Sequence, residues 1–136
     1  KDLLEKALKI SIIHYGEDHP QTGITLTNLG TAYGSLGQYE KQKDLLEKAL
    51  KINIIHYGED HPQTGITLDN LGNAYGDLGQ YEKKKDLLEK ALKISIIHYG
   101  EDHPQTGITL TNLGTAYGSL GQYEKQKDLL EKALKI

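Results

Sequence analysis

The sequence predicts an all-α fold, an α-solenoid of stacked antiparallel helical hairpins. Three observations support this prediction. The chain repeats itself every 42 residues, which is typical of solenoids, propellers and arrays whose units stack on their neighbours. Each unit holds two segments in which apolar residues recur with the period of an α-helix. No segment shows the strand pattern that each blade of a propeller would need.

The repeats are nearly identical in sequence. Residues 11–52 and 95–136 are the same, and residues 53–94 differ from them at five positions. Residues 1–10 match the end of a preceding unit. We therefore expect one repeat array over residues 1–136, in which a partial unit is followed by three repeats.

The first predicted helix of each unit, called helix A here, is represented by residues 20–37, PQTGITLTNLGTAYGSLG. Pro20 suits the first helical position, and Gly37 suits the residue that closes the helix. Leucine, alanine and tyrosine share one face, whereas threonine, serine and asparagine share the other, with Ile24 among them. Three glycines lower the helix propensity of this segment, so we expect the helix to depend on tertiary packing.

The second predicted helix, called helix B, is represented by residues 39–58, YEKQKDLLEKALKINIIHYG. Its apolar residues fall on one broad arc and its charged residues on the opposite side, as in a helix that contacts two neighbours. Gly58 suits the position after the helix, where a left-handed conformation ends it. A tight turn around LGQY joins helix A to helix B, and the loop GEDHP leads into the next unit.

The composition argues against several classes of function. The chain has no cysteine, which excludes disulfide and thiol chemistry, and we expect a cytoplasmic protein. No apolar run is long enough to cross a bilayer. The formal net charge is −3, and neither helix gathers lysine and arginine on one face as nucleic-acid binders usually do. We therefore expect neither nucleic acid nor a membrane as a partner.

The segment LTNLGTAYGSLGQYEKQKDLLEKALKI, residues 26–52, resembles a tetratricopeptide repeat. The residues that carry the resemblance are Leu29, Gly30, Ala32, Tyr33, Leu36, Gly37, Tyr39, Ala49 and Leu50. The usual repeat has about 34 residues. The longer helix B makes this variant similar to the 42-residue repeats of the kinesin light chain type. The resemblance implies a right-handed superhelix that binds protein or peptide partners, with helices A lining its concave side.

One position departs clearly from the family pattern. The small alanine expected early in helix B is replaced by Gln42, Lys84 or Gln126. A lysine there can lay its stem on the core and carry its charge outward. The close contact between helices A and B that is typical of the family is therefore left open by the sequence. Leucine also replaces the large aromatic residue expected early in helix A, which is a conservative change.

The segment HYGEDHPQTG recurs at residues 14–23, 56–65 and 98–107 and raises the question of a metal site. A structural interpretation explains the whole motif. Aspartates such as Asp18 compensate the positive N-terminus of helix A, and histidines such as His14 lie in the last turn of helix B, where a cation is favoured. Proline and glycine supply the reversal of the chain.

The functional alternative is a weak divalent metal site formed by His14, Glu17, Asp18 and His19. It would use mixed nitrogen and oxygen ligands on a surface turn, without the spacing of a zinc finger. A nucleophile would likewise need a base and a concave pocket, which a threefold-repeated surface does not offer. We therefore expect no metal, no cofactor and no catalytic residue.

The polar face of helix A is the strongest candidate site, because the resemblance implies that it holds an extended peptide. Its residues in the three repeats are Ile24, Thr27, Asn28, Thr31, Ser35, Ile66, Asp69, Asn70, Asn73, Asp77, Ile108, Thr111, Asn112, Thr115 and Ser119. The alternative is a merely solvated face, since every amphipathic helix has one. Three of the five variable positions lie on this face, and an isoleucine recurs within it, which favours binding.

We therefore predict a protein-interaction scaffold rather than an enzyme. Asp69 and Asp77 are the only charges on the polar face, so we expect a preference for a peptide with a basic residue near its middle. The alternative is a purely structural array, engineered or recently duplicated, without a single ligand. Neither end carries a polar capping repeat, so we also expect head-to-tail self-association.

Overall fold

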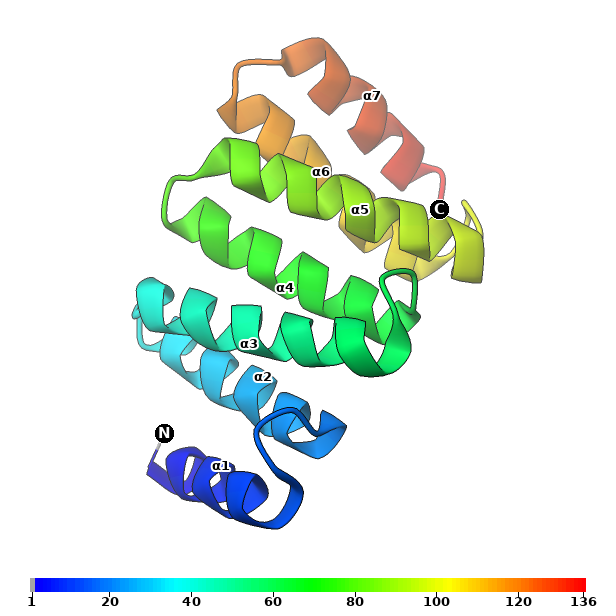
Figure 1. The fold of residues 1–136 in the computed structure, drawn as a ribbon. Coiled ribbons are helices and arrows are strands. Elements are labelled where there is room, and N and C mark those ends of the chain that lie inside the picture. Colours follow the sequence, from blue (N-terminus) through cyan, green and yellow to red (C-terminus); the bar gives the residue numbers. More distant parts are fainter. Residues whose placement is uncertain (1) are drawn as a thin grey trace. The chain divides into compact units, whose positions relative to one another are not determined.

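The computed structural model describes residues 2–136, which form seven α-helices and no strand. The helices are α1 (Asp2–Tyr15), α2 (Pro20–Ser35), α3 (Tyr39–Tyr57), α4 (Pro62–Asp77), α5 (Tyr81–Tyr99), α6 (Pro104–Ser119) and α7 (Tyr123–Leu134) (Figure 1). They fall into two compact units. The first unit ends at Glu59 and holds α1 to α3, and the second unit, Asp60–Ile136, holds α4 to α7.

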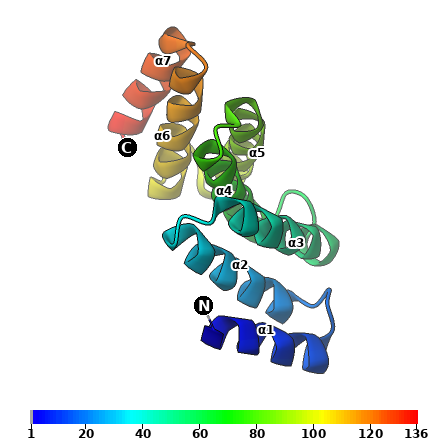
Figure 2. The ribbon, with the colours of Figure 1, turned by 90° about the vertical axis from the view of Figure 1, so that its left-hand side faces the viewer.

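Consecutive helices pack against each other within each unit. In the first unit α2 lies against both α1 and α3, and in the second α5 lies against both α4 and α6, with α7 on α6 (Figures 1 and 2). The predicted hairpins of helix A and helix B are α2–α3, α4–α5 and α6–α7. The predicted repeat boundary between residues 52 and 53 falls inside α3. Each hairpin therefore begins at the start of a helix A and not at the first residue of a predicted repeat.

The glycines predicted to end the helices have positive φ angles, although the ψ of 169° at Gly58 differs from that of a left-handed helix. Gly58 follows α3 with a φ of 93°, and Gly37 follows α2 with a φ of 76°. Helix α2 ends at Ser35, before its predicted end, because the N–H of Gly37 bonds to the Gly34 carbonyl and the N–H of Gln38 bonds to the Tyr33 carbonyl. This pair of hydrogen bonds is a Schellman motif.

The core lies within the hairpins, as between α2 and α3, and also between one hairpin and the next, as between α5 and α6. In the second unit Leu88, Leu113 and Tyr117 form a buried cluster, and Leu92 and Leu129 pack against it. Burial of these side chains is the main source of stability, at about 1.5–3 kcal/mol for each large apolar side chain.

Glycines on helix A allow helix B to approach closely. A Cβ atom added at Gly72 would lie 3.1 Å from Cγ of Leu88, and one added at Gly65 would lie 3.0 Å from Cγ2 of Ile94. These glycines cost helix propensity, but they let buried side chains of helix B touch the backbone of helix A. The packing explains why helix A tolerates them.

The long side chains of helix B that replace the small alanine of the family pattern also lie over glycines. A Cβ atom added at Gly34 would lie 2.6 Å from the carboxamide of Gln42, and one added at Gly76 would lie 2.6 Å from Cδ of Lys84. Glycine on helix A therefore provides the space that a small residue on helix B provides in the family pattern. The close contact between helices A and B, left open by the sequence, is present.

Candidate interaction surface

Each loop between repeats ends with a histidine that caps the next helix. Nδ1 of His19, His61 and His103 accepts a hydrogen bond from the backbone N–H two residues later, at 3.0 Å in each case. The charge of the preceding aspartate can compensate the positive end of the helix, but the hydrogen-bonded cap is the imidazole. An Nδ1 that accepts a hydrogen bond carries no proton, so Nε2 is the ring nitrogen left to carry one.

The other histidine of the motif connects neighbouring repeats. In the first unit, Nε2 of His56 on α3 donates to the carbonyl of Asp18 in the loop before α2. In the second unit, Nε2 of His98 on α5 donates to the carbonyl of Asp60, at 2.7 Å. Both histidines of HYGEDHPQTG therefore have structural roles at the repeat junction.

Two kinds of feature are absent from residues 2–136. No group of three or more histidine, aspartate or glutamate side chains in this range could hold a metal ion. No helix in the same range is long and apolar enough to cross a membrane.

Removing one histidine cap is expected to destabilise the second unit. His103→Ala leaves an N–H at the start of α6 without its acceptor and should lower the free energy of unfolding by about 1 kcal/mol. Denaturation with urea, followed by circular dichroism, measures this loss. His103→Asn is the matched control, because it also loses the stacking on Tyr99 but keeps a capping oxygen. Equal stability of the two variants would contradict the capping role.

Most residues of the predicted polar face are accessible on their helices. Ile24 on α2 is 48% exposed, Ile66 on α4 is 39% exposed and Ile108 on α6 is 54% exposed. Thr27, Asn70, Asn73 and Asn112 are half-buried, whereas the following residues are exposed: Asn28, Thr31, Ser35, Asp77, Thr111, Thr115 and Ser119. The second unit brings α4 and α6 into contact, so their polar faces adjoin.

Asp69 is the exception, because its side chain is buried. It is only 6% exposed, and its carboxylate accepts hydrogen bonds from the Thr109 hydroxyl at 3.0 and 3.2 Å and from the Gln105 amide at 3.4 Å. Burial raises the pKa of this carboxyl to about 6, and the two hydrogen bonds oppose that shift. Asp69 thus joins α4 to α6, and the expectation that it presents an exposed charge to a ligand is wrong.

The threonines of the polar face use their hydroxyl protons within their own helices. On α6, Thr111 donates to the Gly107 carbonyl at 3.0 Å and Thr115 donates to the Thr111 carbonyl at 3.1 Å. The same bonds occur on α2, where Thr27 and Thr31 are the donors. These hydroxyls therefore offer only acceptor lone pairs to a ligand.

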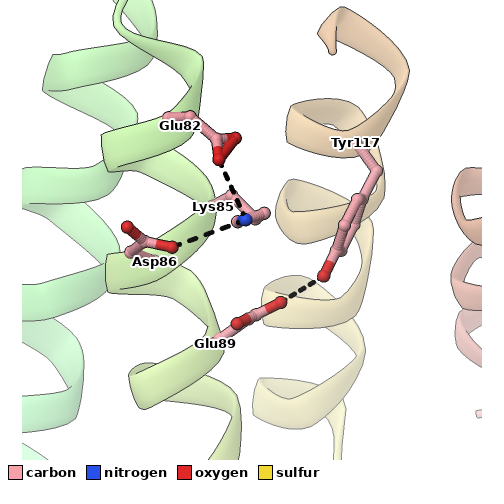
Figure 3. Close-up of polar contacts among 5 residues, drawn as sticks. All are labelled: Glu82, Lys85, Asp86, Glu89 and Tyr117. Carbon is pink, nitrogen blue, oxygen red and sulfur yellow. Dashed lines mark hydrogen bonds and ion pairs between the residues drawn. The ribbon is translucent and has the colours of Figure 1, made fainter. Parts of the chain in front are cut away.

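The second unit carries a recess between α5, α6 and α7. A pocket of about 280 Å³ is lined mainly by Leu92, Leu113, Leu129 and Tyr117. The Tyr117 hydroxyl donates to the Glu89 carboxylate on α5 (Figure 3). Burial, followed by this bond, raises the pKa of Tyr117 to about 12. The bond joins one repeat to the next, as the Tyr33–Glu5 bond does in the first unit.

The ion pairs beside this recess lie on one helix. Lys85 on α5 lies 3.2 Å from Glu82 and 3.6 Å from Asp86, as Figure 3 shows. Pairs as exposed as these contribute at most about 1 kcal/mol each. All three residues lie on α5, so these pairs join no two helices.

Family models of repeats match the chain along its length. A model described as tetratricopeptide repeat matches residues 64–105, and a second model with the same description matches residues 1–54 and 85–136. Among curated proteins, none matches the sequence.

Solved structures with the same helical arrangement include three informative relatives. BtubC (BKLC) from P. vanneervenii is 25% identical with a TM-score of 0.91, over 98% of this chain and 54% of that chain. A protein from Podosopora anserina, described as a kinesin light chain with nearly identical TPR-like repeats, is 27% identical with a TM-score of 0.90, over 98% and 64%. The Sgt2 TPR domain from Aspergillus fumigatus is 26% identical with a TM-score of 0.64, over 83% and 64%.

These neighbours confirm the predicted all-α solenoid and its similarity to the kinesin light chain type. The chain spans 54% to 64% of the lengths of these three relatives.

Proposed function

Because the chain belongs to the tetratricopeptide repeat family, we propose that it is a protein-interaction scaffold that holds an extended peptide on the exposed faces of its A helices. Repeats of this family generally mediate interactions between proteins. The finer assignment, to this face and to an extended peptide, is our own and is supported by the chemistry of the face.

The recurrent exposed isoleucine carries the proposal. Ile24, Ile66 and Ile108 occupy the same position of successive A helices, and each leaves between 39% and 54% of its surface in contact with solvent. Each stands among polar residues, where solvation alone favours a polar side chain. A ligand that covers Ile66 and Ile108 of the second unit would remove apolar surface from water, at about 25 cal/mol for each Å² covered.

Asparagine amides next to the isoleucines supply the polar contacts. In the second unit Asn70 on α4 and Asn112 on α6 are both half-buried and occupy equivalent positions on adjoining helices. An amide side chain donates and accepts, so it can pair with the main chain of a peptide of any sequence. The face can therefore bind the backbone of a peptide in extended form.

A peptide array tests this proposal. Decapeptides of varied sequence are probed with the wild-type chain and with the double variant Asn70→Ala, Asn112→Ala. We expect a subset of peptides to bind, and the double variant to lose at least about fivefold in affinity, which corresponds to about one hydrogen bond. The matched control is Lys90→Ala, which removes an exposed residue of helix B. Binding that the asparagine variant leaves unchanged would contradict the proposal.

The near-identity of the repeats favours a second candidate, a purely structural array without a ligand. Residues 11–52 and 95–136 remain identical even on the exposed face, where packing imposes no choice of residue. The peptide array separates the two candidates. If the protein is purely structural, the wild-type chain should bind no peptide more strongly than the Asn70→Ala, Asn112→Ala variant does.

A further inference from the structure

Acceptor oxygens lie toward the C-terminal ends of α4 and α6 on the polar face of the second unit. Thr115 on α6 has already donated its hydroxyl proton to the Thr111 carbonyl, so it presents lone pairs. Asp77, the last residue of α4, is exposed and forms no ion pair with any residue in the range 2–136. The negative end of the α4 dipole lies at the same place and adds to the negative potential.

Asp77 lies close to the level of Thr115. Asp69 on α4 contacts Thr109 on α6, and the two helices run in the same direction because each is the A helix of its hairpin. Asp77 follows Asp69 by about two helical turns, and Thr115 follows Thr109 by nearly as much. The Asp77 carboxylate and the Thr115 hydroxyl therefore belong to one end of the face.

Little positive charge opposes this acceptor-rich end. The A helices contain no lysine or arginine. Lys84 on α5 interacts electrostatically with Asp77, and its side chain lies over Gly76. Burial lowers the pKa of Lys84, and the negative charge of Asp77 partly opposes this shift, yet the two groups form no ion pair. Asp77 therefore stays open to a cation from outside.

The variable positions of the middle repeat point to the same place. Of the three that lie on this face, Asp69 is buried and bonded to α6, whereas Asn73 is half-buried and Asp77 exposed. The outer repeats have threonine and serine at the last two positions. The chemistry that a ligand can meet therefore differs between repeats only toward the C-terminal half of helix A.

We infer that the peptide held on this face carries a lysine or arginine that binds at Asp77, so that the site selects basic peptides at the C-terminal end of α4. The inference rests on the proposed function and names its class of partner. The acidic residue that binds the ligand is therefore Asp77 and not Asp69, which acts as a positioning residue between α4 and α6. An exposed charge pair of this kind should favour a basic over a neutral peptide about threefold to fivefold, and salt should weaken the preference.

A positional library of decapeptides provides the test. One position is fixed in turn as lysine, arginine, glutamine or glutamate, the others are degenerate, and binding is measured at low and high salt. For the wild type we expect the lysine and arginine pools to bind about threefold to fivefold better than the glutamine pool at low salt. The difference should shrink at high salt.

Three variants that copy residues of the outer repeats separate the roles of the charges. Asp77→Ser should abolish the preference, Asp69→Thr should keep it, and Lys84→Gln should increase it because it removes the opposing charge. Thermal melting by circular dichroism verifies that each variant is folded. A preference that survives Asp77→Ser, or one that only Asp69→Thr abolishes, would overturn the inference.

Failure of this inference can be distinguished from failure of the proposed function. Pools that bind equally well, and lose affinity in the Asn70→Ala, Asn112→Ala variant, overturn only the selection of basic peptides. If every pool binds the wild-type chain no better than it binds the double variant, both the inference and the proposed function are overturned.

Discussion

Replacing Leu88 by alanine is expected to lower the free energy of unfolding by about 2–5 kcal/mol, the largest effect of any single change considered. Leu88 is fully buried, packs in a cluster with Leu113 and Tyr117, and lies close to the backbone of α4 at Gly72. The neighbouring helices cannot collapse into the space left behind, because backbone forms one wall of it. Equilibrium unfolding in urea, followed by circular dichroism, measures the loss.

Leu134→Ala is the control for this experiment. Leu134 is 86% exposed at the end of α7, so its replacement should change the stability by less than about 0.5 kcal/mol. A loss for Leu88→Ala as small as that of the control would show that the α4–α5 hairpin does not pack as described.

Mild acid is expected to stabilise the chain through Asp69. The pKa of its carboxyl is about 6 in the folded state, against about 3.9 in an unfolded chain. Above pH 6 the group is charged in both states, and the folded state bears the cost of the buried charge. As the pH falls from about 6 to about 4, the folded state takes up a proton before the unfolded state does, so stability rises.

The difference between wild type and Asp69→Thr isolates this effect, since the other titrating groups are common to both. The wild type should gain about 2 kcal/mol relative to the variant between pH 7.5 and pH 4.5, because one pKa unit corresponds to about 1.4 kcal/mol. Urea denaturation at several pH values measures the gain. Asp69→Asn should show no such gain relative to Asp69→Thr, since neither residue titrates. A wild-type difference that is independent of pH would contradict the buried carboxylate.

The helices could be predicted from the sequence because their signals are local. Helix B was predicted over residues 39–58, and α3 covers Tyr39–Tyr57 with Gly58 as its C-terminal cap, where φ is positive. Pro20 begins α2 as predicted, because proline fixes a helical φ and lacks the N–H that the first turn leaves unpaired. Such signals need no knowledge of distant contacts.

The role of the loop histidines could not be read from the usual preferences for helix caps. Those preferences name serine, threonine, aspartate and asparagine, so they do not single out His19 as the cap of α2. A neutral imidazole presents one acceptor nitrogen, which does the same work when the backbone of the histidine is extended, as it is here with a ψ of 144°.

Asp69 was misplaced for a different reason. Helical periodicity places residue 69 on the polar face with Asn73 and Asp77, but it does not give the distance to the next A helix. The neighbour that buries Asp69 is Thr109, 40 residues later. The signal was present in the sequence, because the middle repeat alone has an acid at this position and a threonine follows at that spacing in the next repeat.

The most direct test of the scaffold is to locate the bound peptide on the second unit. The chain has no cysteine, so a photo-crosslinker can be attached at one introduced cysteine, either Thr115→Cys on the polar face of α6 or Lys90→Cys on the outer side of α5. Both positions are exposed, so labelling should be equally efficient. The account predicts that a peptide selected from the lysine pool is crosslinked at position 115 and not at position 90. Crosslinking at position 90 alone, or equally at both positions, would contradict it.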